Sequence, residues 1–171
     1  MREDYVLITP RLGLRPFVAD DVDDLHAILG DEETMRYYPA PFSREQCEDW
    51  IRRARESYAS VGFGLWAVED RSTGEFLGDC GPAIRTVEGR EEPEIGWHTK
   101  RSRWNQGIAT EAATACRDHA FGPLGLERVI ALVRPENVAS GRVAQKIGMT
   151  VDREIDYHGL RHYVYAVSRP G

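Results

Sequence analysis

The segment Trp104–Ala112, with the sequence WNQGIATEA, places the strongest constraint on how this chain folds. It follows a strand-like run at residues 94–99 and passes from polar residues through Gly107 into an Ala-rich stretch typical of a helix. The first N–H groups of a helix have no partner within it and carry partial positive charge. Because Gly107 has no side chain to cover them, this strand–loop–helix unit suits an anion such as a pyrophosphate. A glycine before an Ala-rich helix also occurs without a ligand, and the two better-known phosphate-loop motifs are absent.

The overall composition narrows the class of protein. A chain of 171 residues can bury a core of its own, and we expect a single domain over residues 1–171. No apolar run approaches the ~20 residues of a membrane span, and the first four residues, MRED, are too polar to open a signal peptide. Three scattered cysteines without Cys-x-x-Cys spacing argue for a reducing compartment and against zinc. We therefore expect a cytoplasmic protein.

The net charge bears on the partner. A charge of −6 disfavours nucleic acid and is compatible with a cationic small molecule or a basic peptide. No membrane partner is expected, and the sequence leaves open whether the chain forms a homodimer.

Hydrophobic spacing predicts elements in the order β-α-α-β-β-β-α-β-α-β-β, a mixed sheet with helices on both faces. Asp20 or Asp21 is expected to cap the first helix, and Ser43 with Gln46 forms a capping-box pattern for the second. Residues 35–42 are expected as an aromatic loop and Glu88–Glu92 as a charged loop. The predicted strands are 12–17, 63–68, 76–85, 94–99, 128–133, 150–155 and 163–168, and the predicted helices begin near residues 20, 43, 108 and 135.

A second polar pair stands at the start of the last helix. Asn137 and Ser140 follow the buried run Arg128–Val133, at the carboxyl end of that predicted strand. Ligands of open α/β sheets bind outside the carboxyl ends of strands. If the strands 94–99 and 128–133 are neighbours, a long ligand would lie with its phosphates on the first loop and its reactive end near the second.

Four pieces in this order resemble the GCN5-related N-acetyltransferases (GNAT), in particular the ribosomal-protein N-terminal acetyltransferases. They are TPRLGLR at residues 9–15, EIGW at 94–97, WNQGIATEA at 104–112, and Asn137-x-x-Ser140 followed by KIGM at 146–149. Gly107 and Ala109 match the family loop pattern Gln/Arg-x-x-Gly-x-Gly/Ala, while Trp104 stands in the Gln/Arg place. The resemblance implies an α/β (mixed α+β) fold. Its central, mostly antiparallel sheet would have six to seven strands, helices on both faces, and a splayed pair of parallel strands at the cofactor cleft.

The resemblance also implies an activity. This is transfer of the acetyl group of acetyl-CoA to a primary amine, either a protein N-terminus or a small-molecule amine, without a metal. Amides from about Asn105 to Thr110 would hold the pyrophosphate, the backbone of residues 97–99 would pair with the pantetheine arm, and Asn137 would bond to that arm. The cofactor-binding residues implied are Trp97, His98, Thr99, Trp104, Asn105, Gln106, Gly107, Ile108, Ala109, Thr110, Asn137 and Ser140.

Direct attack on a thioester needs a neutral amine, and an alkyl amine of pKa about 10.4 is only ~0.04% neutral at pH 7. Glu94 is the candidate base, acting through water; the alternative is a solvated carboxylate at a strand edge. A backbone N–H of strand 94–99 is the candidate donor to the oxyanion. Ser140 is the candidate hydrogen-bond donor to the sulfur, and the alternative is a serine in the first turn of a helix. Asn137 is likewise an ordinary N-cap residue.

Acceptor specificity is expected from the variable loops around the site. The expected pocket residues are Tyr37, Tyr38, Trp50, Tyr157 and Tyr163. Gly159 and the strand context argue against His158 and His162 as a metal pair, and the His98 side chain is expected to serve a packing or surface role. The rival function is an acyl-CoA-binding sensor or regulatory module that has lost catalysis, and transfer of a longer acyl group also stays open.

Overall fold

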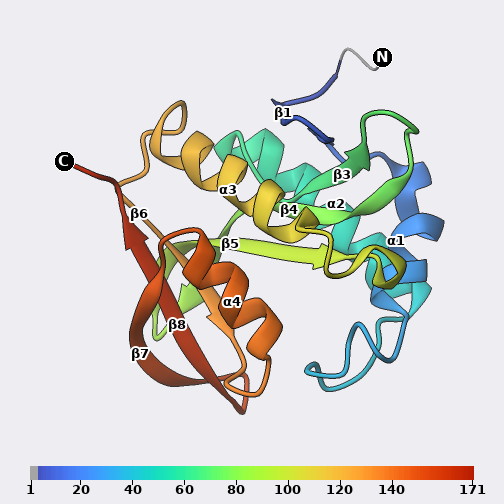
Figure 1. The fold of residues 1–171 in the computed structure, drawn as a ribbon. Coiled ribbons are helices and arrows are strands. Elements are labelled where there is room, and N and C mark those ends of the chain that lie inside the picture. The colour runs from blue at the N-terminus through green and yellow to red at the C-terminus, as the bar shows by residue number, and fades with distance from the viewer. Residues whose placement is uncertain (1–3) are drawn as a thin grey trace.

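The computed structural model describes residues 4–171, so the first three residues of the expected domain lie outside the described part. Eight strands of the described chain form one sheet in the order β1-β2-β3-β4-β5-β6-β8-β7 (Figure 1). The strands are β1 Leu7–Ile8, β2 Leu12–Arg15, β3 Trp66–Asp70, β4 Phe76–Val87, β5 Arg90–Thr99, β6 Arg128–Val133, β7 Thr150–Tyr157 and β8 Leu160–Ser168. The helices are α1 Val22–Leu29, α2 Arg44–Val61, α3 Ile108–Phe121 and α4 Val138–Lys146, with 3₁₀ turns at Ala19–Asp21 and Arg101–Arg103.

The mixed sheet predicted from the sequence is confirmed, with one strand more than expected. The extra strand is the two-residue β1, which pairs antiparallel with β2. None of the helices within residues 4–171 is both long and apolar enough to cross a membrane.

Side-chain alternation along the strands builds cores on the two faces of the sheet. Trp66 and Val68 of β3 pack with residues of α3 and α4, whereas Ala67 between them packs with α1 and α2. Figure 1 shows α3 and α4 in front of the sheet and α1 and α2 behind it. The prediction of helices on both faces is therefore confirmed.

The starts of the first two helices differ in how they are capped. Ser43 Oγ accepts from Gln46 N at 3.1 Å and Gln46 Oε1 accepts from Ser43 N at 2.8 Å, so the predicted capping box is confirmed. Asp21 occupies the N-cap position of α1, as one of the two predicted candidates, but its side chain makes no cap hydrogen bond there. Its carboxylate instead accepts two hydrogen bonds of 2.8 Å from Arg15, which also binds Glu69. All three side chains are buried, and a buried guanidinium requires such partners.

Two further boundaries differ from the prediction. Residues 90–92 belong to β5 rather than to a charged loop, because Glu88 and Gly89, both at positive φ, make a tight turn between β4 and β5. Helix α4 begins at Val138, so Pro135 lies before it, and the prediction of Asn137 as its N-cap is confirmed. The predicted start of α3 at residue 108 and the predicted bounds of β6 are confirmed.

The parallel strands β5 and β6 part near the middle of the sheet. They share one register pair, Glu94 with Ile130, whereas β5 pairs with β4 along residues 90–99 and β6 pairs with β8 along residues 128–133. Beyond Glu94 and Ile130, the facing edges of β5 and β6 are therefore not paired with each other. The predicted splayed pair of parallel strands is confirmed.

Candidate active site

The loop between β5 and α3 presents a run of unbonded backbone N–H groups. Asn105 (φ 59°) and Gly107 (φ 75°) adopt left-handed conformations that turn the chain into α3. Within residues 4–171, no N–H group from Asn105 to Thr110 donates to an acceptor of the chain; the first helical bond runs from Glu111 N to Gly107 O at 3.0 Å. These groups lie at the positive end of the α3 dipole, where an anion is stabilised.

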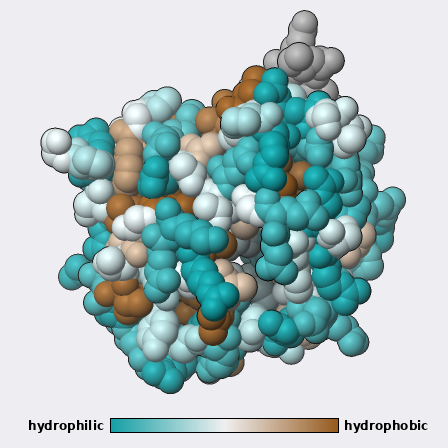
Figure 2. Space-filling view, viewed as in Figure 1, coloured by the Kyte–Doolittle hydropathy of each residue, from teal (hydrophilic) through white to brown (hydrophobic). Residues whose placement is uncertain are grey.

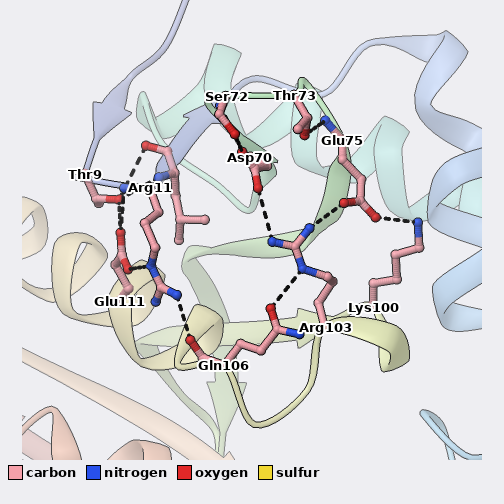
Figure 3. A network of polar contacts seen from close by, with 11 residues as sticks. Thr9, Arg11, Asp70, Ser72, Thr73, Glu75, Lys100, Arg103, Gln106 and Glu111 are labelled. Carbon is pink, nitrogen blue, oxygen red and sulfur yellow. Dashed lines mark hydrogen bonds and ion pairs between the residues drawn. The ribbon is translucent and has the colours of Figure 1, made fainter.

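Arg11 holds this loop from the side of β2 (Figure 3). It donates from Nη1 to Gln106 O at 2.8 Å and from Nε to Glu111 Oε2 at 2.6 Å. Because the C=O and N–H of one peptide point in opposite directions, fixing the Gln106 carbonyl toward Arg11 turns the Gly107 N–H away from it. Glu111 also accepts from Thr9 Oγ1 at 2.5 Å. Burial alone would raise the pKa of Glu111, but the hydrogen bonds from Thr9 and Arg11 outweigh it and lower this pKa.

Arg103 ties the same loop to the turn between β3 and β4 (Figure 3). It donates from Nε to Gln106 Oε1 at 3.1 Å and from Nη2 to Asp70 Oδ2 at 3.1 Å, and it also pairs with Glu75. Hydrogen bonds from Ser72, followed by the one from Arg103, lower the pKa of Asp70 to about 2. The loop is thus held on both sides of Gln106 before any ligand binds.

The edge of β5 facing β6 offers backbone groups to an extended ligand. Lys100 N donates to Leu77 O at 2.7 Å, and bonded pairs alternate along an antiparallel ladder. The backbone of His98, opposite Asp79, therefore faces β4, whereas that of Trp97 and Thr99 faces the gap. Trp104 Nε1 donates a hydrogen bond of 2.7 Å to the Thr99 carbonyl oxygen, which is therefore not free to bind a ligand. Of the backbone groups expected to bind the pantetheine arm, the N–H and C=O of Trp97 and the N–H of Thr99 face the gap. The backbone of His98 does not, and His98 lines the cavity through its side chain instead.

A cavity of about 360 Å³ lies where β5 and β6 part. Figure 2 shows the same face of the molecule hollowed near its centre, beside α4. Four of the five expected acceptor residues line the cavity, as do five other residues singled out from the sequence: Tyr37, Tyr38, Trp50 and Tyr157, together with Glu94, Trp97, His98, Asn137 and Ser140. Tyr163 does not line it; its ring contacts Tyr165, with 6.3 Å between centroids, and packs with the core on the α3 and α4 face.

Glu94 joins the two strands at the point where they part. Its Oε1 accepts from Arg85 Nε at 3.0 Å, and its Oε2 accepts from Leu132 N at 3.3 Å. Both carboxylate oxygens thus already accept a hydrogen bond from the protein. The alternative of a freely solvated strand-edge carboxylate does not describe Glu94.

At the start of α4, the Asn137 side chain accepts from Ser140 N at 3.2 Å, so Asn137 is the N-cap. Ser140 lines the cavity, and no described residue makes a hydrogen bond to its hydroxyl. The cap and a role in the cavity wall are compatible, because the cap uses only the Ser140 backbone.

Sequence reasoning missed the residue that organises the other side of the cavity, Asp79. This fully buried carboxylate accepts from His98 Nδ1 and from Trp50 Nε1, both at 2.8 Å, and His98 Nε2 lies 2.7 Å from Tyr38 Oη. One signal in the sequence points to it: Asp79 stands inside the otherwise uncharged run Phe76–Ala83, and a carboxylate there needs partners. Among the described residues, no group of three or more His, Cys, Asp or Glu is placed to hold a metal ion.

Comparison with known proteins adds to this geometry. The family model of the acetyltransferase (GNAT) domain matches residues 11–150. The uncharacterized protein YkkB of Bacillus subtilis is 37% identical over 150 residues, covering 87% of each chain. The uncharacterized N-acetyltransferase YoaA of the same organism is 30% identical over 167 residues, covering 96% of this chain and 91% of its own.

Solved structures share the fold. A GNAT-family acetyltransferase from Bacillus anthracis is 27% identical with a TM-score of 0.79, covering 95% of this chain and 98% of its own. The ribosomal L7/L12 α-N-protein acetyltransferase RimL, solved in complex with coenzyme A, has a TM-score of 0.77 at 19% identity, covering 96% and 98%. At this identity the likeness to RimL is one of fold.

Proposed function

Because this chain belongs to the GNAT acetyltransferase family, we propose that it transfers an acetyl group from acetyl-CoA to a primary amine. The observation that carries the proposal is the run of unbonded N–H groups from Asn105 to Thr110 beside the gap between β5 and β6. Unpaired donors at a helix start fit the diphosphate of a nucleotide. The solved complex of RimL with coenzyme A supports this choice of ligand.

The chain's own residues then have distinct proposed roles. Asn105–Thr110 bind the diphosphate, with the Gly107 N–H oriented by Arg11. The gap-facing backbone of Trp97 and the Thr99 N–H bind the extended arm, and Asn137 contributes its amide group. Trp104 and Gln106 shape the loop, since their side chains bond to Thr99 and Arg103. Acetyl-CoA supplies the thioester, whose C–S bond breaks as the C–N bond to the amine forms.

Ser140 is proposed as the donor that stabilises the leaving sulfur. Ser140 lines the cavity, and its hydroxyl has no hydrogen-bond partner within residues 4–171. A thiol of pKa near 8.5 leaves as a thiolate without full protonation, so a hydrogen bond suffices. A serine hydroxyl is too weak an acid to deliver its proton completely, which fits this limited role.

The acceptor would enter between the aromatic walls of the cavity. Tyr37 and Tyr38 from the loop after α1, Trp50 from α2 and Tyr157 from the β7–β8 hairpin form these walls. Their apolar rings and polar tips suit an amine carried on a partly apolar group. We propose a small-molecule amine or a protein N-terminus as the acceptor, and RimL, which acts on the latter, supports that option.

The test measures both the binding of coenzyme A and the turnover of acetyl-CoA. Calorimetry measures the affinity for coenzyme A, and a thiol reagent measures its release from acetyl-CoA with a panel of N-terminal peptides, polyamines and aminoglycosides. We expect binding together with amine-dependent thiol release. Binding without turnover of any amine would favour the acyl-CoA-binding sensor instead, and absence of binding would overturn the proposal. Propionyl- and butyryl-CoA, run in parallel, measure the length of acyl group that the cavity accepts.

A further inference from the structure

Three side chains from distant parts of the chain form a continuous hydrogen-bonded path from the cavity into the core. Tyr38 comes from the loop before α2, His98 from the end of β5 and Asp79 from β4. Tyr38 Oη lies 2.7 Å from His98 Nε2, and His98 Nδ1 lies 2.8 Å from Asp79 Oδ1. The side chain of Asp79 is fully buried and that of His98 is 10% exposed. Of the three, Tyr38 and His98 line the cavity.

The direction of each hydrogen bond follows from the chemistry of the partners. An ionised carboxylate only accepts hydrogen bonds, so Asp79 accepts from the Nδ1–H of His98 and from the Nε1–H of Trp50. A neutral imidazole protonated at Nδ1 has its lone pair at Nε2, which therefore accepts from the Tyr38 hydroxyl. The path thus sets one tautomer of His98 and leaves the Tyr38 oxygen able to accept a proton from the cavity.

We infer that Tyr38, His98 and Asp79 form a proton relay that deprotonates the acceptor amine, an inference that rests on the proposed function. An N–H bond of the substrate ammonium breaks and its proton goes to the Tyr38 oxygen, while the Tyr38 proton moves to His98 Nε2. The positive charge of the ammonium thereby becomes that of a His98 imidazolium paired with Asp79. The neutral amine keeps its electron pair and attacks the thioester carbon. As the C–S bond breaks, the nitrogen loses its second proton to the departing thiolate, and the proton held on His98 leaves through Tyr38 to water.

The surroundings of Tyr38 fit a hydroxyl that passes protons without losing its own at neutral pH. Although 40% of the Tyr38 residue is exposed, its hydroxyl contacts His98 within the site. Loss of water around the hydroxyl, followed by the negative charges of Glu94 and Asp79, raises the pKa of Tyr38. Trp50 packs edge-on against His98, with 5.9 Å between ring centroids, and fixes the imidazole from the α2 side.

Other charged and titratable groups face the relay and enter its pH dependence. On the sheet these are Arg85 and Glu94, which pair with each other. Cys47 from α2 lies near Asp79, and burial, followed by the charge of Asp79, raises the pKa of its thiol to about 11. The remaining titratable groups that line the cavity are Tyr37, Arg134, Tyr157, His158 and His162.

Tyr38 and Glu94 differ in how many hydrogen bonds they already accept from the protein. Glu94 accepts from Arg85 and from Leu132 N, which ties it to the junction of β5 and β6. Tyr38 has one bonded partner and a free lone pair beside the cavity. We therefore assign proton removal to the relay and the joining of the strands to Glu94.

The experiment compares wild type with His98→Gln and Tyr38→Phe across a series of amines whose pKa values run from about 10 down to about 7. For alkyl amines at pH 7, we expect kcat/KM to fall on the order of 100-fold in each variant, while the affinity for coenzyme A stays unchanged. The loss should shrink for amines of low pKa and at high pH, because those amines are already neutral. The matched control is His26→Gln, a histidine of α1 outside the cavity, which should behave as wild type. Losses that are equal for all amines would overturn the relay.

A second readout does not depend on turnover. Nitrogen NMR of imidazole-labelled protein, with the His98 signal assigned through His98→Gln, should show the Nδ1–H tautomer, and Asp79→Asn should weaken this preference. An Nε2–H tautomer in the wild type would overturn the relay even if the protein is active. If wild type turns over no amine while the tautomer is as expected, the proposed function fails and the geometry of the three side chains stands.

Discussion

The guanidinium of Arg11 donates a hydrogen bond of 2.8 Å to the carbonyl oxygen of Gln106, the residue directly before Gly107. This contact links the bend before β2 to the loop that opens α3, across 95 positions of sequence. It orients the peptide that carries the Gly107 N–H, and Glu111 holds the same guanidinium from the other side. The shape of the anion-binding loop is therefore fixed by tertiary contacts as well as by its own residues.

Arg11→Ala should weaken binding of coenzyme A by roughly tenfold, because the variant loses the hydrogen bonds that orient the Gln106–Gly107 peptide. Calorimetry measures the change in Kd. Arg55→Ala, which removes an exposed arginine from α2, serves as the control and should leave Kd unchanged. Equal affinity of Arg11→Ala and wild type would show that the loop holds its shape without this contact.

Gly107→Glu should abolish detectable binding of coenzyme A, with Kd raised by at least about 100-fold, because a carboxylate repels the diphosphate and its bulk fills the loop. Gly89→Glu is a matched control: its φ of 78° is close to the 75° of Gly107, so the backbone strain is similar, and it stands in the turn between β4 and β5. The two variants should unfold at similar temperatures. Retained binding in Gly107→Glu would rule out the loop as the anion site.

Ser140→Ala should lower kcat about tenfold with little change in the affinity for coenzyme A, because it removes a hydrogen bond to the developing thiolate. The helix cap survives, since Asn137 accepts from the backbone N of residue 140. Asn137→Ala, by contrast, should lower the free energy of unfolding by about 1 kcal/mol through loss of the cap. Steady-state kinetics and urea unfolding separate the two effects. An unchanged kcat in Ser140→Ala would show that the Ser140 hydroxyl has no part in catalysis.

Asp70→Asn should make the free energy of unfolding depend less on pH between about pH 4 and pH 2. The pKa of Asp70 is about 2 in the folded protein against an ordinary 3.8, so its carboxylate stabilises the fold above about pH 4 and this contribution disappears as the pH falls toward 2. The variant should be less stable than wild type at pH 6 and close to it at pH 2. Urea unfolding at both pH values checks this, with Asp24→Asn, at an exposed position of α1, as the control. A constant difference between Asp70→Asn and wild type would exclude this linkage.

The sequence predicts best those features that local patterns determine. The start of α3, the bounds of β6, the capping box at Ser43 and Gln46, and the loop before Ile108 all follow from residues close together in the chain. The family resemblance, confirmed by the match over residues 11–150, adds the parting of the parallel strands.

What the sequence does not predict are contacts between distant residues. Tyr38 and His98 lie 60 positions apart, and His98 and Asp79 lie 19 apart, so no periodicity indicates that they meet. Asp21 illustrates the same limit, because its proximity to α1 predicts a cap while a buried Arg15 claims its carboxylate. In both cases a buried polar side chain finds its partners within the fold; for Asp21 these are Arg15 and the nearby backbone N–H of Val18, at 2.8 Å.

The seam between β5 and β6 has a mechanical consequence. Among the described residues, one backbone register pair, Glu94 with Ile130, joins β1–β5 to β6–β8. Side-chain contacts of Glu94 with Leu132 N and of Glu92 with Arg153 also cross the seam, and α3 packs against both β5 and β6. A ligand that pairs with the edges of both β5 and β6 beyond this register pair would join the two parts of the sheet. Its arrival should slow hydrogen exchange in the amides of β6 and β8 and raise the melting temperature of the whole sheet together.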